Sequence, residues 1–238
     1  MSGKVALISG ANKGIGKEVA KQLGKHGFKV YIGSRDLARG QSAAAELAKD
    51  NVDAVAIQLD VTSQESVDKA ISHIAQSEGK LNVLINNAGI VNERGITFDT
   101  TDIEKVEETF QTNFFGPLRL TKAASGLLEK TVDSRLINVS STLGSLTNAT
   151  TPEFADFRFL GYGSSKAALN MLTLFSAKAL GKNGVSVNSI CPGYVATDIN
   201  DNQGYRTVEQ GASIVVKLAT EEKPPTGGFF NEAGVIPW

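Results

Sequence analysis

The segment from Ser9 to Gly16 constrains this chain more than any other, and its sequence is Ser-Gly-Ala-Asn-Lys-Gly-Ile-Gly. It follows an apolar run from Val5 to Ile8 and leads directly into a helical pattern, which is typical of a strand, a tight turn and a helix start. Glycines let the backbone turn sharply and approach a ligand closely, and the free N–H groups at a helix N-terminus attract anions. The segment therefore predicts a binding site for a ligand that carries phosphate.

The spacing of these glycines narrows the kind of phosphate site. Gly10, Gly14 and Gly16 give the pattern G-x-x-x-G-x-G, which differs from the G-x-G-x-x-G of larger dinucleotide-binding folds. The ending of a P-loop is also missing, because Glu18 follows Lys17 where a P-loop has serine or threonine. A P-loop kinase is therefore disfavoured, and a purely structural glycine turn stays open as an alternative.

The composition is that of a folded domain that binds a small molecule. The chain has 238 residues, 41% of them apolar, which is enough for one large α/β domain over residues 1–238. Its 24 basic and 25 acidic residues are well mixed, so we expect neither a nucleic acid nor a membrane as partner. The first residues lack the pattern of a signal peptide, and we expect a cytoplasmic protein. Because Cys191 is the single cysteine and the two histidines, His26 and His73, are far apart, we expect no disulfide and no metal site.

Short apolar runs alternate with helical patterns along the chain. The expected strands are Val5–Ile8, Phe28–Ile32, Val52–Leu59, Leu81–Ile85, Arg135–Val139, Val185–Ile190 and a last one near Phe229 and Phe230. The expected helices are Ile15–Leu23, Asp36–Lys49, Asp60–Gln76, Thr101–Thr112, Phe115–Lys130, Tyr162–Leu180 and Val208–Ala219, with a loop over Thr142–Leu160. Seven strands alternating with helices predict a doubly wound parallel α/β sheet covered on both faces, with ligands at the carboxyl ends of the strands.

The end of the second expected strand bears on the choice of cofactor. A dinucleotide site places an acidic residue there for the adenosine ribose hydroxyl, or a basic residue for a 2′-phosphate. Here the sequence is Gly33-Ser34-Arg35, and Lys13 in the glycine turn adds a second positive charge. Because arginine holds a doubly charged phosphate well, these residues favour NADPH or NADP⁺ over NAD. The alternative is that both cations are solvated surface residues.

One pair of residues could carry proton transfer. Tyr162 and Lys166 are four positions apart in an expected helix, so their side chains project from one face. A nearby ammonium group stabilises a phenolate and lowers its pKa, which would let Tyr162 act as an acid or a base. Such pairs also arise by chance in helices. Here, however, the glycine turn, the turn Asn87-Ala88-Gly89 and Ser141 all lie at strand ends on the same edge of the expected sheet.

Taken together, these motifs resemble those of the short-chain dehydrogenase/reductase family over the whole length of the chain. The matching pieces, in the family's order, are Gly10, Gly14 and Gly16, then Asp60, Asn86–Gly89, Asn113, Ser141, Tyr162, Lys166 and the segment from Pro192 and Gly193 to Thr197. The glycine turn, the sequence Asn113-Phe114-Phe115-Gly116 and the C-terminal segment are most similar to the NADPH-dependent carbonyl reductase branch. The resemblance implies a single Rossmann-type domain of about seven parallel strands.

The resemblance also implies a role for each matching residue. Tyr162 donates a proton to a carbonyl oxygen, Ser141 orients the same oxygen, Lys166 binds the nicotinamide ribose and lowers the tyrosine pKa, and Asn113 holds a water molecule linked to Lys166. The cofactor-binding residues that we expect, besides Tyr162 and Lys166, are Gly10, Asn12, Lys13, Gly14, Ile15, Gly16, Arg35, Asp60, Val61, Asn87, Ala88, Gly89, Pro192, Gly193, Val195 and Thr197.

The chain departs from most of the family between Ser141 and Tyr162, where an insertion of roughly Thr147 to Phe157 borders the expected substrate pocket and one edge of the usual oligomer interface. It leaves open whether the protein is a monomer or a homo-oligomer. The expected pocket rim contains Phe154, Phe157, Tyr194, Tyr205 and Trp238, with Arg158 and Arg206 as its cations.

The expected activity is the reduction of an aldehyde or ketone to the alcohol with NADPH. Two alternatives stay open. One is a regulator that senses NADP(H) without turnover, and the other is a reductase of a carrier-bound 3-oxoacyl chain, which would favour a basic patch beside the pocket.

Overall fold

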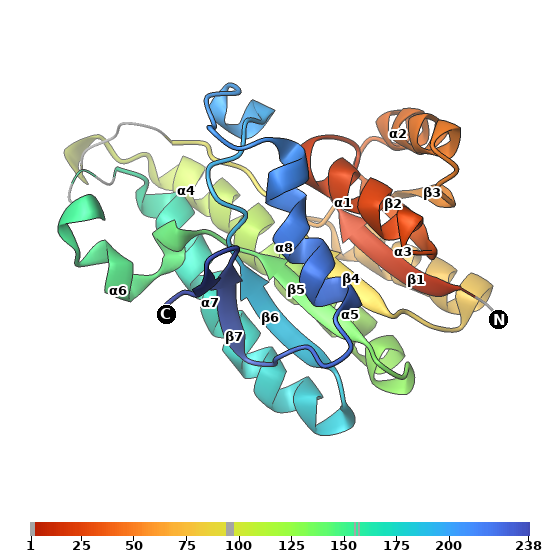
Figure 1. Cartoon of the computed structure of the whole chain (residues 1–238). Helices are drawn as coiled ribbons and strands as arrows, with labels where there is room; N and C mark the ends of the chain where they lie inside the picture. Colours follow the sequence, from red (N-terminus) through yellow and green to blue (C-terminus); the bar gives the residue numbers. More distant parts are fainter. Residues whose placement is uncertain (1–2, 94–97, 155, 157) are drawn as a thin grey trace.

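The computed structural model describes residues 3–93, 98–154, 156 and 158–238, and its centre is one sheet (Figure 1). The strand order is β3-β2-β1-β4-β5-β6-β7-β8, and the first seven strands in the chain pair in parallel. Their bounds are β1 Lys4–Ser9, β2 Phe28–Ser34, β3 Ala54–Gln58, β4 Val83–Asn86, β5 Arg135–Val139, β6 Ser186–Ile190, β7 Gly228–Asn231 and β8 Gly234–Val235. The order reverses between β1 and β4, which is where a sheet of this kind opens a crevice for a ligand.

The prediction of a doubly wound, Rossmann-type sheet of seven parallel strands is confirmed, but an eighth strand was missed. β8 runs antiparallel to β7 and has two residues, too few to show a periodic pattern. The turn between the two strands depends on Asn231, whose Oδ1 accepts hydrogen bonds from the N–H groups of Ala233 and Gly234.

Helices cover both faces of the sheet, and the strands alternate between two cores. The bounds of the helices are α1 Gly14–Lys25, α2 Leu37–Lys49, α3 Gln64–Glu78, α4 Ile103–Phe110, α5 Gly116–Lys130, α6 Leu146–Ala149, α7 Leu160–Leu180 and α8 Val208–Thr220. On one face α1, α2 and α8 pack against Ala6 and Ile8, and on the other α3, α5 and α7 pack against Val5 and Leu7. Successive residues of a strand point to opposite faces, so β1 contributes to both cores.

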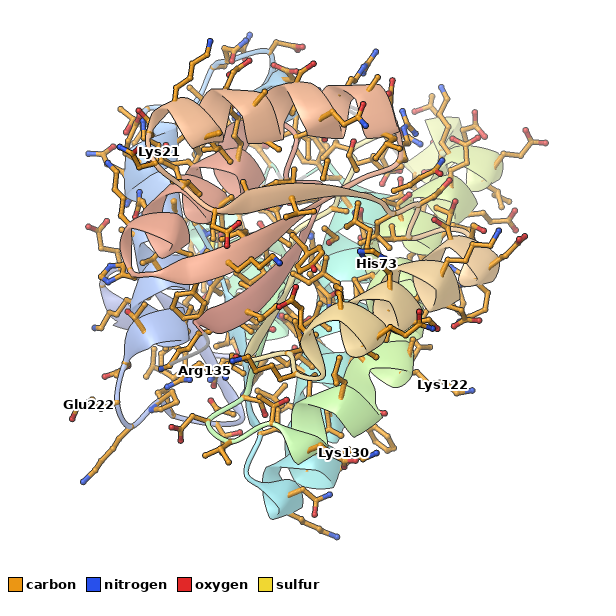
Figure 2. All side chains as sticks on the ribbon, turned by 90° about the vertical axis from the view of Figure 1, so that its right-hand side faces the viewer. Lys21, His73, Lys122, Lys130, Arg135 and Glu222 are labelled. Atoms are coloured by element: carbon orange, nitrogen blue, oxygen red, sulfur yellow. The ribbon has the colours of Figure 1, made fainter. Side chains whose placement is uncertain are left out.

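The outer faces of these helices carry the charged side chains. Figure 2 shows Lys21 on α1 and Lys122 and Lys130 on α5 pointing away from the sheet. Among the described residues, every helix is too short or too polar to cross a membrane.

The predicted helices are present, but several of their starts were wrong. The helix expected from Asp60 begins at Gln64, because Ser63 caps it and Asp60 instead closes a turn by accepting hydrogen bonds from Thr62. The helix expected from Tyr162 begins at Leu160. The segment expected to be a loop over Thr142–Leu160 contains α6 and two short 3₁₀ turns.

The two helices expected on either side of Asn113 are joined by a further helical turn, so the helical backbone continues without a break. α4 ends at Phe110, a π-helical turn covers Gln111–Phe115, and α5 begins at Gly116. A π turn is wider than an α turn and is frequent at functional sites. It places the side chain of Asn113 in the interior of the protein, where it is fully buried.

Candidate active site

Ser141 follows the carboxyl end of β5, and Tyr162 lies in the first turn of α7. The side chain of Ser141 acts on the Tyr162 phenol as a hydrogen-bonding group and lowers its pKa. The preceding serine, Ser140, is buried and donates from its Oγ to the Lys166 carbonyl oxygen at 3.4 Å. Of the two serines, the structure therefore brings Ser141 to the phenol.

Lys166 lies one helical turn after Tyr162, and only 4% of its surface is exposed. Its Nζ donates to the Val139 carbonyl oxygen at 2.8 Å and lies 5.5 Å from the centre of the Tyr162 ring. The backbone of Lys166 packs directly against Gly144, where any side chain would collide with it. The lysine is thus held rigidly beneath the phenol.

The pKa values of this pair differ from the simple expectation that the lysine lowers the tyrosine pKa. Burial is the largest effect on the phenol and raises the pKa of Tyr162, the neighbouring Cys191 raises it further, and the hydrogen bond from Ser141 opposes them. Burial also disfavours the ammonium form and lowers the pKa of Lys166 to about 8. Removal from water is therefore the largest effect on the pKa of each group.

Asn113 connects the site to the neighbouring loop. Its Oδ1 accepts from the Ile90 N–H at 2.9 Å, and its Nδ2 donates to the Ile90 carbonyl oxygen at 3.0 Å and to Ser165 Oγ at 3.1 Å. A Cβ on Gly89 would lie 3.4 Å from Asn113 Oδ1 and 3.6 Å from Lys166 Nζ. Asn113, Gly89 and Lys166 therefore meet at one point.

The glycine turn and the Asn86–Gly89 turn interlock where the strand order reverses. Asn87 Nδ2 donates to the carbonyl oxygens of Ser9 and Gly10 at 3.0 and 3.1 Å, and Ser9 Oγ accepts from the N–H groups of Asn87 and Ala88. Gly10 has φ 65°, and a side chain on Gly16 would overlap Asn87. Both glycines are thus required by the backbone geometry.

The N-terminus of α1 lies at this crevice, directly after the glycine turn. The residue before it, Lys13, offers no side-chain cap to the helix, so the helix end is open to an anion. Thr197 lies across the crevice, within 3.5 Å of where a Cβ on Gly14 would stand. The loop from Cys191 to Asp198 therefore closes the other side of the site.

The two cations expected near a 2′-phosphate lie in different surroundings. Arg35 directly follows β2 and is exposed, and the hydroxyl of Ser34 is turned away to the Asp36 carbonyl oxygen at 2.7 Å. Lys13 instead pairs with Asp198, with 2.5 Å between Nζ and Oδ2. Arg35 is therefore available at the strand end, whereas Lys13 bridges the crevice.

A cavity of about 590 Å³ opens beside Ser141. Its lining consists of Ser141–Leu143, Cys191–Tyr194, Tyr205, Arg206, Ile214 and Asn231–Ala233. Of the expected rim, Tyr194, Tyr205 and Arg206 are present, and the two tyrosine rings lie 6.1 Å apart. Trp238 instead stacks on Phe229 at 5.5 Å, and Phe157 lies outside the described residues. Phe154 and Arg158 are not part of the described lining.

A sequence model of the family described as short chain dehydrogenase matches residues 4–221. The chain belongs to this family. The chain is therefore an NAD(P)-dependent oxidoreductase that acts on CH–OH groups, with a nucleotide cofactor and a small-molecule substrate. The resemblance on which the sequence prediction rested is confirmed.

Known members of the short-chain dehydrogenase family match nearly the whole chain. It is 31% identical to (+)-neomenthol dehydrogenase of Arabidopsis thaliana, over 98% of this chain and 97% of that one. It is 32% identical to a 3-oxoacyl-[acyl-carrier-protein] reductase of a Synechocystis species, over 98% and 97%. A crystal structure of NADPH-bound carbonyl reductase from chicken fatty liver superposes with a TM-score of 0.86, at 28% identity and 100% coverage of both chains.

Sequence reasoning missed three residues of this site. Ser9 holds the Asn86–Gly89 turn, Ser165 accepts a hydrogen bond from Asn113, and Glu93 is buried against α7. Glu93 lies between two polar residues, Asn92 and Arg94, and such a stretch is typical of an exposed loop. The local sequence therefore held no signal for its burial.

Proposed function

We propose that this chain reduces an aldehyde or ketone to the alcohol with NADPH, and that Tyr162 donates the proton to the carbonyl oxygen. The observation that supports this most is the interaction of the Tyr162 phenol with Ser141, which itself lines the cavity of about 590 Å³. A carbonyl oxygen placed beside Ser141 would accept hydrogen bonds from both hydroxyls. Such bonds strengthen as negative charge develops on the oxygen.

The protonation states of the site suit this direction of reaction. Burial raises the pKa of Tyr162, so the phenol keeps its proton at neutral pH. As the proton moves to the carbonyl oxygen, the buried ammonium of Lys166 beside the ring stabilises the phenolate left behind. Because the pKa of Lys166 is about 8, Lys166 can lose and regain a proton near neutral pH and return one to Tyr162.

The residues of the crevice fit a dinucleotide. The uncapped N-terminus of α1 suits the diphosphate, with Asn12, Gly14 and Ile15 around it. Asp60 and Val61 would contact the adenine, Asn87 to Gly89 the adenosine-side ribose and the floor of the site, and Lys166 the nicotinamide ribose. Pro192, Gly193, Val195 and Thr197 would contact the carboxamide and phosphates. When bound, the cofactor supplies the hydride, and the protein supplies orientation and the proton.

NADPH is our choice over NADH because of Arg35. Arg35 directly follows β2, which ends beside the glycine turn, and its side chain is exposed. Position 34 is a serine, so it offers no carboxylate that would select the ribose hydroxyl of NADH. The chicken carbonyl reductase structure is an NADPH complex. Lys13 would join Arg35 at the phosphate only by leaving Asp198.

The cavity supports a free carbonyl compound of medium size as the substrate. Leu143, Tyr194, Tyr205 and Ile214 give it apolar and aromatic surface, which suits an uncharged substrate. Because the chain is similar to the Synechocystis 3-oxoacyl-[acyl-carrier-protein] reductase, a carrier-bound acyl chain is the second candidate substrate. The cation at the cavity, Arg206, is already paired with Glu232, so it offers little to an acidic carrier.

A cofactor-oxidation assay over a panel of aldehydes, ketones and 3-oxoacyl thioesters, run with NADPH and NADH, tests this proposal. We expect turnover of free carbonyl compounds, with NADPH preferred. Tight cofactor binding without turnover of any compound would favour a sensor, and preference for the thioesters would favour the carrier-bound substrate.

The proposal includes one NAD(P)-binding domain over residues 1–238 that works in the cytoplasm. The single cysteine, Cys191, is free and buried, which suits a reducing compartment. Localisation of a tagged full chain tests this point.

A further inference from the structure

A backbone N–H group at the N-terminus of α7 donates a hydrogen bond to a residue that is far away in the sequence. The first N–H groups of a helix have no partner within it, and the residue before α7, Phe159, makes no side-chain cap. The Tyr162 N–H instead donates to Glu93 Oε1 at 2.8 Å. A carboxylate is thus bound to the backbone of the residue that we propose as proton donor.

Glu93 is enclosed rather than resting on the surface. It is 4% exposed, and a Cβ on Gly161 would collide with its Oε1 and lie 3.1 Å from Val106 of α4. Glycine at position 161 therefore makes room for the carboxylate. Its second oxygen, Oε2, is buried and has no hydrogen-bond partner among the described residues.

The peptide of Tyr162 is held from its other side as well. Ser165 Oγ donates to the Tyr162 carbonyl oxygen at 2.7 Å and accepts from Asn113 Nδ2. Asn113 also fixes both backbone groups of Ile90, three residues before Glu93. The loop segment from Ile90 to Glu93 and the backbone of Tyr162 are therefore tied together at two points.

The position of Glu93 at the helix end makes its contact favourable. The N-terminus of a helix carries a partial positive charge that attracts a carboxyl oxygen, and the Tyr162 N–H is the partner that the described structure gives to Glu93 Oε1. The bond therefore resists displacement of the first turn of α7.

We propose that Glu93 is a positioning residue, which fixes the first turn of α7 and so holds the Tyr162 phenol in hydrogen-bond reach of Ser141. The inference rests on the proposed role of Tyr162 as proton donor. A misplacement of about 1 Å in a reacting group can lower a rate about a hundredfold, so a loosened α7 start should lower kcat.

The contact can be observed without turnover. The chain has four tyrosines, Tyr31, Tyr162, Tyr194 and Tyr205, so labelling with ¹⁵N-tyrosine gives four backbone amide signals. In Glu93→Gln the Tyr162 N–H exchanges a carboxyl acceptor for an amide, which accepts more weakly, and we expect its signal alone to move strongly upfield in the proton dimension. The control Glu107→Gln, which neutralises an exposed carboxylate on α4, should leave all four signals in place.

Kinetics then test the positioning role. Glu93→Leu should lower kcat ten- to a hundredfold while the KM for the carbonyl compound and the Kd for NADPH stay within twofold. Glu93→Gln, which keeps a neutral acceptor, should recover part of kcat. Gly161→Ala raises helix propensity yet displaces the carboxylate, so it should lower kcat although Glu93 is intact.

The outcomes separate this inference from the proposed function. If the wild type reduces carbonyl compounds but Glu93→Leu and Gly161→Ala keep its kcat, or if the Tyr162 amide signal does not move in Glu93→Gln, Glu93 has no positioning role. If the wild type reduces no carbonyl compound, the proposed function fails and the positioning role fails with it, while the amide signal still measures the contact.

Discussion

Lys166 Nζ lies 5.5 Å from the centre of the Tyr162 ring and donates to the Val139 carbonyl oxygen at 2.8 Å. This hydrogen bond links the part of α7 that carries Tyr162 and Lys166 to the end of β5. The same strand end leads to Ser141, whose side chain lowers the pKa of the phenol. The tyrosine, the lysine and the serine are therefore positioned by one helix and one strand, both of which are well packed. Catalytic groups on rigid elements keep their geometry better than groups on loops.

The buried lysine should destabilise the fold at neutral pH. Its pKa is about 8 in the folded chain and ordinarily 10.5, so below pH 8 both states carry the proton and folding must bury a charge. Between pH 8 and 10.5 the unfolded state holds more protons, and the stability of the wild type rises with pH. Relative to Lys166→Met, the free energy of unfolding of the wild type should gain about 2 to 3 kcal/mol between pH 7 and pH 10.

Urea unfolding of both proteins at these two pH values measures that gain. The comparison cancels the other titrating groups, because both proteins share them. If the free energies of unfolding of the wild type and Lys166→Met differ by the same amount at both pH values, Lys166 is not buried as a charge.

Arg35 should decide the cofactor. Loss of a charge-assisted contact to phosphate costs about 1.5 to 3 kcal/mol, so Arg35→Ala should weaken NADPH binding roughly ten- to a hundredfold. NADH lacks the 2′-phosphate and should bind almost as before. Fluorescence titration with each cofactor measures both constants, and equal weakening of the two would make Arg35 an ordinary surface cation.

The ion pair between Lys13 and Asp198 should compete with the cofactor. About 60% of the Lys13 side chain is exposed, and exposed pairs of this kind are weak because water and salt screen them. Asp198→Asn frees Lys13 for the phosphate and should tighten NADPH binding by up to about fivefold. The double variant Lys13→Ala, Asp198→Asn should lose this gain. Unchanged or weaker NADPH binding by Asp198→Asn would show that Lys13 does not reach the cofactor.

Much of the fold and of the site could be predicted from the sequence, because the signals are local. The glycine turn, the apolar strands and the four-residue spacing of Tyr162 and Lys166 each lie within one or two elements, whose periodicity fixes which residues share a face. The π turn at Asn113 and the two-residue β8 were beyond such reasoning. A single wide turn and so short a strand leave no periodic pattern.

Contacts between segments that are distant in the chain could not be predicted from the sequence either. The bond from Tyr162 to Glu93 and the pair of Lys13 with Asp198 join residues that only the packing of whole elements brings together. The raised pKa of Tyr162 could not be predicted for the same reason. Spacing along a helix shows that the two groups are neighbours, but their burial depends on the sheet and on Gly144 above them.

The central claim, that Tyr162 donates the proton in an NADPH-dependent carbonyl reduction, is tested most directly by Tyr162→Phe. The variant keeps the ring and its packing and loses the hydroxyl that interacts with Ser141. Proton donation by a positioned side chain contributes about 10² to 10⁴ in rate, so kcat for NADPH oxidation should fall by that factor while the Kd for NADPH stays within twofold. Near-wild-type turnover by Tyr162→Phe on a carbonyl compound that the wild type reduces would contradict the account.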